Sequence, residues 1–178
     1  MGLSIDEMKA VDRARGQLEQ LSIQVANKEA IMKRDAANAA LITFKTYFTN
    51  RDFALNSSDW NVSASHGSIN FSIAIKNAAV GGIECLTLKF PEMVKKAPLS
   101  IFLEVQPGQT VDSAPAEAST ARGPLEEVQE KLTLMRARLA EPPKKWQYFT
   151  LQATTSAGAA PQRKEYVSFN RLLEEECP

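Results

Sequence analysis

Apolar residues recur at helical spacing through the first part of the chain. Ser4 and Glu7 have the spacing of a capping box, and Leu3 and Met8 have that of a hydrophobic staple, so the sequence marks a helix N-terminus twice. We predict one long helix, or two nearly collinear helices, from residue 4 to about residue 48. The apolar stripe of this segment consists of Met8, Val11, Leu18, Leu21, Val25, Met32, Ala36, Ala40, Phe44 and Tyr47.

The two halves of this helix differ in the width of their apolar face. The stripe is interrupted around Lys28 and Glu29, and beyond that point additional apolar residues widen it. We predict that the second half packs into the globular core, whereas the narrow first half projects toward a partner helix or a second copy of the chain. The alternative is that the first half lies on its own domain as an ordinary amphipathic helix. The candidate partner-binding residues are Val11, Leu18, Leu21 and Val25.

Alternating apolar and polar residues between residues 59 and 75 predict a β-hairpin. If His66 and Gly67 form a two-residue turn, Val62 lies opposite Phe71, and every apolar residue of the hairpin falls on one face. This placement gives His66 a purely structural role in a turn. The predicted buried face consists of Trp60, Val62, Phe71 and Ile73.

Two further strand-like segments follow, at residues 83–90 and 99–105, and a break that contains Pro91 and Pro98 separates them. Four consecutive strands of this kind predict an antiparallel meander with one apolar face. The broad second half of the N-terminal helix is the segment best suited to cover that face. We therefore predict that residues 1–105 combine the long helix with a four-stranded antiparallel sheet.

A change in composition separates this region from the rest of the chain. Residues 106–122 are rich in Pro, Ala, Ser and Thr, which predicts a flexible linker or a long surface loop. Pro124 at a first helical position and the Pro142-Pro143 pair bound a second helix. The apolar stripe of the second helix consists of Leu125, Val128, Leu132, Met135 and Leu139.

The final segment contains two strand-like runs, WQYFTLQAT and EYVSFNRLL, which predict a β-hairpin followed by a solvated acidic tail at residues 174–178. Residues 123–178 are thus predicted to form a helix and a hairpin that pack on the same core. The predicted fold class is α+β: a long N-terminal helix packed on an antiparallel β-meander, followed by a second helix and a C-terminal β-hairpin.

Composition narrows the class of protein. The chain has 178 residues, 44% of them hydrophobic, and its 21 basic residues balance its 21 acidic ones. These values predict a folded globular protein without a net electrostatic attraction to nucleic acid or anionic membranes. The two cysteines have no framework spacing, no secretory signal is expected, and no apolar stretch approaches the roughly 20 residues of a membrane span. We therefore expect a cytoplasmic location.

Candidate catalytic and cofactor chemistry is sparse in the sequence. A single histidine, His66, is incompatible with two-histidine zinc motifs and leaves a catalytic triad only one possible base, on a predicted turn. The Gly81-Gly82 pair is not followed by the Lys-Ser/Thr of a phosphate-binding loop. We expect no catalytic residues, no metal and no cofactor. A small metal-dependent enzyme with dispersed carboxylates is the remaining enzymatic alternative.

Basic residues alternate with aromatic ones at the start of the last predicted hairpin. This combination is typical of a surface for single-stranded nucleic acid, because cations contact phosphates and rings stack on bases. The spacing of the aromatic residues also fits the inward face of an ordinary strand. The candidate nucleic-acid-binding residues are Lys144, Lys145, Trp146, Tyr148 and Arg171.

Together these patterns favour a non-catalytic protein–protein interaction protein, such as an adaptor, an inhibitor or an accessory subunit, that docks through amphipathic helices onto a protein partner or a second copy of itself. A nucleic-acid-binding accessory protein is the first alternative, and it would use the surface near residues 144–148.

Overall fold

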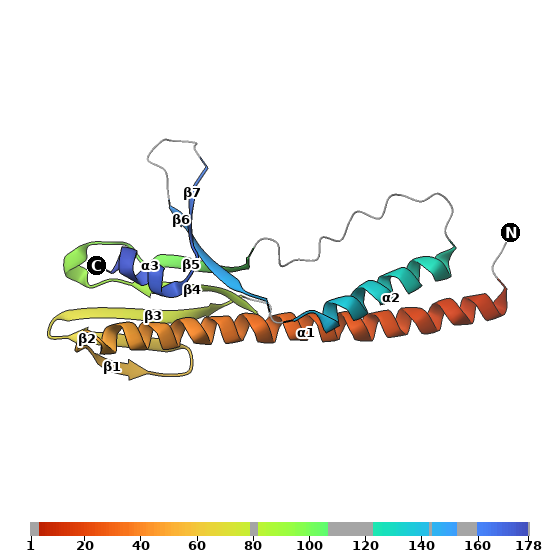
Figure 1. Ribbon diagram of the computed structural model, residues 1–178, viewed down its shortest axis with the longest axis horizontal. Coiled ribbons are helices and arrows are strands. Elements are labelled where there is room, and N and C mark those ends of the chain that lie inside the picture. The colour runs from red at the N-terminus through yellow and green to blue at the C-terminus, as the bar shows by residue number, and fades with distance from the viewer. Residues whose placement is uncertain (1–3, 79–81, 107–122, 143, 153–159, 178) are drawn as a thin grey trace. The chain divides into compact units, whose positions relative to one another are not determined.

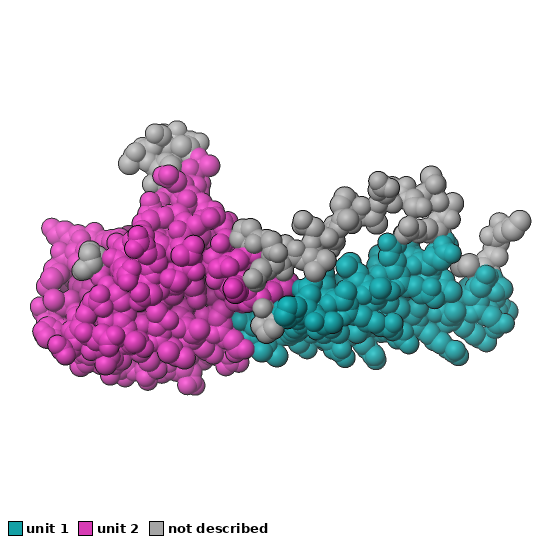
Figure 2. All heavy atoms as spheres, in the orientation of Figure 1, with its two compact units in different colours: residues 1–32, 110–143 teal, residues 33–109, 144–178 magenta. Residues whose placement is uncertain are grey.

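A computed structural model describes residues 4–78, 82–106, 123–142, 144–152 and 160–177. Residues 107–122 of the predicted linker lie outside the described residues. Leu3 of the predicted staple also lies outside them. The chain divides into two compact units (Figure 2): unit 1 combines residues 1–32 with 110–143, and unit 2 combines residues 33–109 with 144–178.

Helix α1 (Ile5–Thr49) contributes to both units. Its N-terminus carries the predicted capping box, in which the Ser4 backbone N–H donates to Glu7 Oε2 at 2.7 Å and the Glu7 N–H donates to Ser4 Oγ at 3.2 Å. The predicted long helix is therefore confirmed as one continuous element.

Unit 2 is built around an antiparallel sheet in which each strand pairs with the next along the chain (Figure 1). The predicted α+β class is confirmed, and the C-terminal strands extend the predicted meander rather than forming a separate sheet. The seven strands are β1 (Ala54–Ser57), β2 (Asn61–His66), β3 (Ile69–Asn77), β4 (Ile83–Lys89), β5 (Leu99–Val105), β6 (Trp146–Gln152) and β7 (Gln162–Tyr166). A 3₁₀ turn, η1 (Glu92–Val94), connects β4 and β5.

The second half of α1 covers one face of this sheet, as predicted. Phe44 and Phe48 are almost completely buried in the core that α1 forms with the sheet, and Ala37 and Ala40 on the same face of the helix have no exposed area. Alternate residues of each central strand face the helix because side chains alternate between the two faces of a strand. The sheet residues with no exposed area in this core are Val62, Ala64, Ile73, Leu86, Leu88 and Ile101.

The β2–β3 hairpin has a different turn from the predicted one. Val62 pairs with Ile73 and His66 pairs with Ile69, so the turn consists of Gly67 and Ser68. Gly67 has a φ of +59°, a left-handed conformation that favours glycine at the first central position of the turn. The predicted turn at His66-Gly67 was wrong, because each β2 residue pairs with a β3 residue two positions further along the chain than predicted. A shift of two residues preserves the direction of the side chains, so the same residues still face the core.

Two residues of this hairpin therefore have other roles than predicted. Trp60 precedes β2 and is 39% exposed, with the Arg34 guanidinium 5.1 Å from its ring centre, so its predicted burial was wrong. His66 ends β2, where its ring lies beside Phe53 and its Nδ1 lies 3.2 Å from the Asp52 carbonyl oxygen. Val62 and Ile73 are fully buried, as predicted, whereas Phe71 is only partly buried and packs against the edge of the core.

The end of the chain forms a helix, α3 (Phe169–Glu176), where the sequence predicted the end of a strand and a solvated tail. Ser168 caps α3, since its Oγ accepts a hydrogen bond from the Arg171 N–H at 3.3 Å. The buried residues of α3 follow helical spacing, which outweighs the strand-like composition of the segment. These buried residues are Phe169, Leu172, Leu173 and Glu176.

Glu176 is the most heavily paired side chain of the supposed acidic tail. Its carboxylate accepts hydrogen bonds from Lys96 Nζ at 2.5 Å, Tyr166 Oη at 2.6 Å and Lys164 Nζ at 2.9 Å, and its side chain is only 6% exposed. Burial alone would raise the pKa of Glu176, but the hydrogen bonds from Lys96, Tyr166 and Lys164 outweigh it and hold the pKa at about 2. The prediction of a solvated tail was therefore wrong.

The residue after Glu176 is also held in the core. Tyr47 on α1 donates a hydrogen bond to the Cys177 carbonyl oxygen at 2.7 Å. Burial raises the pKa of the Cys177 thiol to about 12, so this sulfur stays protonated at neutral pH. Cys85 is also buried, and both cysteines are free thiols.

These contacts predict how acid destabilises the protein. The folded pKa of Glu176 is depressed below its ordinary value, so its contribution to stability is present above about pH 5 and is lost as the pH falls toward 2. We expect Glu176→Gln to lower the free energy of unfolding at neutral pH by up to about 3 kcal/mol, and we expect the difference from wild type to vanish near pH 2. Urea denaturation across this pH range measures both effects.

Glu174→Gln is the matched control for this experiment, because Glu174 lies on the same helix but forms an exposed ion pair with Arg171. Its substitution should change the free energy of unfolding by less than about 1 kcal/mol at any pH. A constant difference between Glu176→Gln and wild type over the whole pH range would contradict the assigned ion-pair cluster.

Candidate functional site

The described part of unit 1 contains the first part of α1 and a second helix, and the two run in the same direction. Helix α2 (Pro124–Ala140) begins as predicted, with Pro124 at its first position and Glu126 Oε2 accepting a hydrogen bond from the Gly123 N–H. The start of α2 lies against the segment around Ala14, and its C-terminal end lies at Lys28. The two helices therefore form a parallel pair (Figure 1).

The contact between these helices uses the stripe that the sequence singled out for partner binding. Ala14 on α1 is buried together with Val128 and Leu132 on α2, and Leu18 and Leu21 pack against this cluster. Val11 and Val25 are also buried, with 7% and 6% of their surface exposed. Leu18 and Leu21 are thus in contact with α2. The helix that covers this part of the stripe in the structure is therefore a second helix of the same chain.

Lys28 explains the interruption of the stripe. Its ammonium group donates hydrogen bonds to the carbonyl oxygens of Leu139 at 2.8 Å, Glu141 at 2.6 Å and Arg138 at 3.4 Å. The last carbonyl groups of a helix have no partner within the helix, and a cation also interacts favourably with the negative end of the helix dipole. Lys28 therefore caps the C-terminus of α2 and fixes it against α1.

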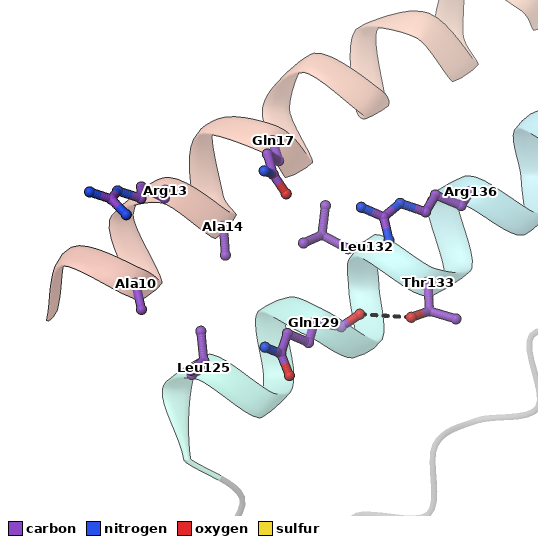
Figure 3. Close-up of a pocket in the computed structure, with 9 residues that line it drawn as sticks. All are labelled: Ala10, Arg13, Ala14, Gln17, Leu125, Gln129, Leu132, Thr133 and Arg136. Atoms are coloured by element: carbon purple, nitrogen blue, oxygen red, sulfur yellow. Dashed lines mark hydrogen bonds between the residues drawn. The ribbon is translucent and has the colours of Figure 1, made fainter. Parts of the chain in front are cut away.

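A groove of about 540 Å³ opens beside the seam between the two helices (Figure 3). Small side chains on α1 leave this space open, and leucines on α2 form the other side of its apolar floor. Polar side chains from both helices border it, and Arg13 and Arg136 lie toward opposite ends of the groove (Figure 3). The lining residues are Ala10, Arg13, Ala14, Gln17, Leu125, Gln129, Leu132, Thr133 and Arg136.

The lining of the groove combines apolar, amide and positively charged side chains. Arg13 and Arg136 supply positive charge, and none of the nine described lining residues is a carboxylate, a histidine or a cysteine. The Thr133 hydroxyl donates to the Gln129 carbonyl oxygen at 3.0 Å, so it is engaged within its own helix. The groove thus presents apolar surface, two amides and two guanidinium groups, but it offers no side chain suited to act as a general base or a nucleophile.

A second groove, of about 310 Å³, lies in unit 2 beside the end of α1. Its polar groups are largely engaged, since Thr43 and Thr46 donate to carbonyl oxygens of their own helix and Arg51 stacks on Tyr47 at 3.6 Å. Ile42, which is 63% exposed, is its most exposed large apolar side chain. The groove is smaller and offers fewer uncommitted polar groups than the groove of unit 1.

The structure places three of the five predicted nucleic-acid-binding residues in contacts within the chain. Trp146 packs against the core and Tyr148 is only 7% exposed, with its hydroxyl donating to the Ala36 carbonyl oxygen at 3.4 Å. Arg171 lies on α3 and pairs with Glu174 and Glu175. Tyr148 is thus part of the core, and Trp146 is partly buried against it.

Within the described residues, no group of three His, Cys, Asp or Glu side chains is arranged to hold a metal ion. Among the described helices, none is long and apolar enough to cross a membrane. Comparisons of the chain with protein-family models, with curated proteins and with solved structures find no match.

Sequence reasoning predicted both stripes but missed the groove beside them. The small residues Ala10 and Ala14, four positions apart beside the stripe, were the sequence signal for open space along this face of α1. Arg13 and Arg136 are far apart in the sequence, and only the parallel pairing of the helices brings them to one groove.

We expect Lys28 to determine how firmly α2 is held. Lys28→Ala leaves three carbonyl groups without this donor, which should weaken the docking of α2 by about 1 to 3 kcal/mol. Hydrogen–deuterium exchange should then show faster exchange along α2 while the sheet of unit 2 keeps its protection. Lys9→Ala, at an exposed position on the same half of α1, serves as the control. Unchanged exchange in α2 of the Lys28 variant would rule out this capping role.

Proposed function

We propose that this protein is a non-catalytic interaction protein that binds an amphipathic helix of a partner protein in the groove between α1 and α2. The observation that carries the proposal is this groove, with its apolar floor and polar borders. Helix-in-groove recognition uses such a surface, because the apolar face of the ligand is buried while its polar face stays in solvent.

The small size of the cluster between α1 and α2 supports a third helix. Among the described residues, Ala14, Val128 and Leu132 are the buried members of this cluster. Two helices bury little surface on their own, and helical bundles gain stability as each added helix covers apolar surface that a pair leaves open. A partner helix in the groove would cover Ala10 and Leu125, which are only partly buried.

The spacing of the floor residues matches a helical ligand. Ala10 and Ala14 are separated by about one helical turn, or roughly 6 Å, and Leu125 and Leu132 by about two turns, or roughly 10 Å. A ligand with apolar residues at positions i, i+3 or i+4, and i+7 would place one side chain beside each of these positions. An extended peptide, with a side-chain repeat of two residues, would not keep this alignment.

Site-specific photo-crosslinking tests the proposal. A photoreactive phenylalanine analogue at Gln129, in an extract of the native host, should form a covalent product with a single partner, and the crosslinked peptide of that partner should be amphipathic and helical. The same analogue at Lys131, exposed on α2 but outside the groove, is the control position. Ala10→Trp fills the groove and should abolish the product from Gln129.

Circular dichroism should first establish that each variant keeps the helix content of the wild type. Equal crosslinking from Gln129 and Lys131, or a product from Gln129 that survives Ala10→Trp, would show that the groove is not the binding surface.

A further inference from the structure

The charge of the groove defines the chemistry of its ligand. The chain as a whole has no net charge, yet the described lining contains two arginines, one from each helix, and no carboxylate. Arg13 and Arg136 are exposed, so both guanidinium groups can be reached by a ligand. The groove is thus a local positive surface on an electrically neutral protein.

Several other basic side chains form ion pairs with carboxylates of the same chain. Lys96 and Lys164 pair with Glu176, and Arg163 pairs with Glu104 and Glu165. Within the part of the chain that the structure describes, Arg13 and Arg136 form no ion pair. Two unpaired guanidinium groups that flank an apolar floor would gain most from carboxylates on the ligand, because each can form a bidentate hydrogen-bonded pair.

A second copy of the chain fits this surface poorly. If two copies met through the same groove about a two-fold axis, each would contribute the same patch, and the interface would contain four arginines without a carboxylate from either lining. Like charges at an interface disfavour association. The charge therefore favours a ligand of different composition over self-association through the groove.

We propose that the ligand of the groove is an acidic amphipathic helix, with aliphatic residues on one face and glutamate or aspartate residues flanking them. This inference rests on the proposed function and adds the charge of the partner. The aliphatic face packs on Ala10 and Leu125, the partly exposed apolar residues of the lining, and the flanking carboxylates pair with Arg13 and Arg136. The amides of Gln17 and Gln129 supply further hydrogen-bond donors at the borders.

Two synthetic peptides of about 21 residues, long enough to form a helix, test the inference. Both carry leucine at the same a and d heptad positions, and they differ only in having glutamate or lysine at the flanking e and g positions. Fluorescence anisotropy with the full chain should give a Kd for the glutamate peptide at least about tenfold lower than for the lysine peptide. Raising the salt from about 50 to about 500 mM should reduce this preference, because salt screens exposed charge pairs.

Charge reversal provides the specific control. Arg13→Glu with Arg136→Glu should reverse the preference between the two peptides. Arg15→Glu with Lys131→Glu changes the net charge by the same amount at exposed positions outside the groove, and it should keep the wild-type preference. Circular dichroism of both double variants establishes that the helices remain folded.

The possible outcomes separate this inference from the proposed function. Equal affinity of the wild type for the two peptides, or the same response from both double variants, would overturn the acidic ligand while leaving helix binding in place. If neither peptide binds at concentrations up to about 1 mM, helix binding in the groove is itself contradicted, and the acidic ligand with it.

Discussion

The length of α1 is the constraint on which the rest of the structure depends. Its 45 residues extend over roughly 67 Å, whereas a seven-stranded sheet is only about 30 Å wide. One sheet therefore cannot bury the whole helix. The broad apolar arc of the second half packs on the sheet, and the narrow stripe of the first half requires a separate partner, which α2 supplies. Lys28 then holds the end of α2 at the place where the stripe is interrupted.

This division produces two units whose described hydrophobic cores differ in size. Among the described residues, the core of unit 2 has 21 buried members, and Glu176 connects the end of the chain to it through Lys96, Lys164 and Tyr166. The corresponding cluster of unit 1 has three buried residues among those described. Binding surfaces are commonly drawn from the less stable parts of a protein, and a ligand that binds only the folded helix pair would stabilise it by mass action. The proposed binding groove lies in the unit that gains most from such a ligand.

Local patterns were sufficient to predict most of the fold, because helices and strands repeat with different periods. The β2–β3 register was wrong, since a shift of two residues leaves the same side chains facing the core and the pattern cannot distinguish the two turns. Helix α3 was missed because three consecutive glutamates are typical of a solvated tail. Glu176 finds its partners at Lys96 and Lys164, which no local pattern connects to it. The predicted stripe of α1 is buried or partly buried except for Met8, which is 49% exposed, but its contact with α2 of the same chain depends on a pairing between distant segments.

The central claim is that α2 lies parallel to the first half of α1 and so creates the groove. Spin labels on cysteines introduced at Gln17 and Gln129, on opposite borders of the groove, test it directly. Cys85 and Cys177 are buried and should remain unlabelled. Electron–electron distance measurement should give one narrow distribution below about 25 Å, because two packed helices of about 10 Å diameter bring these positions together. A broad distribution, or one centred well beyond that distance, would contradict the parallel pair and remove the groove on which the proposed function depends.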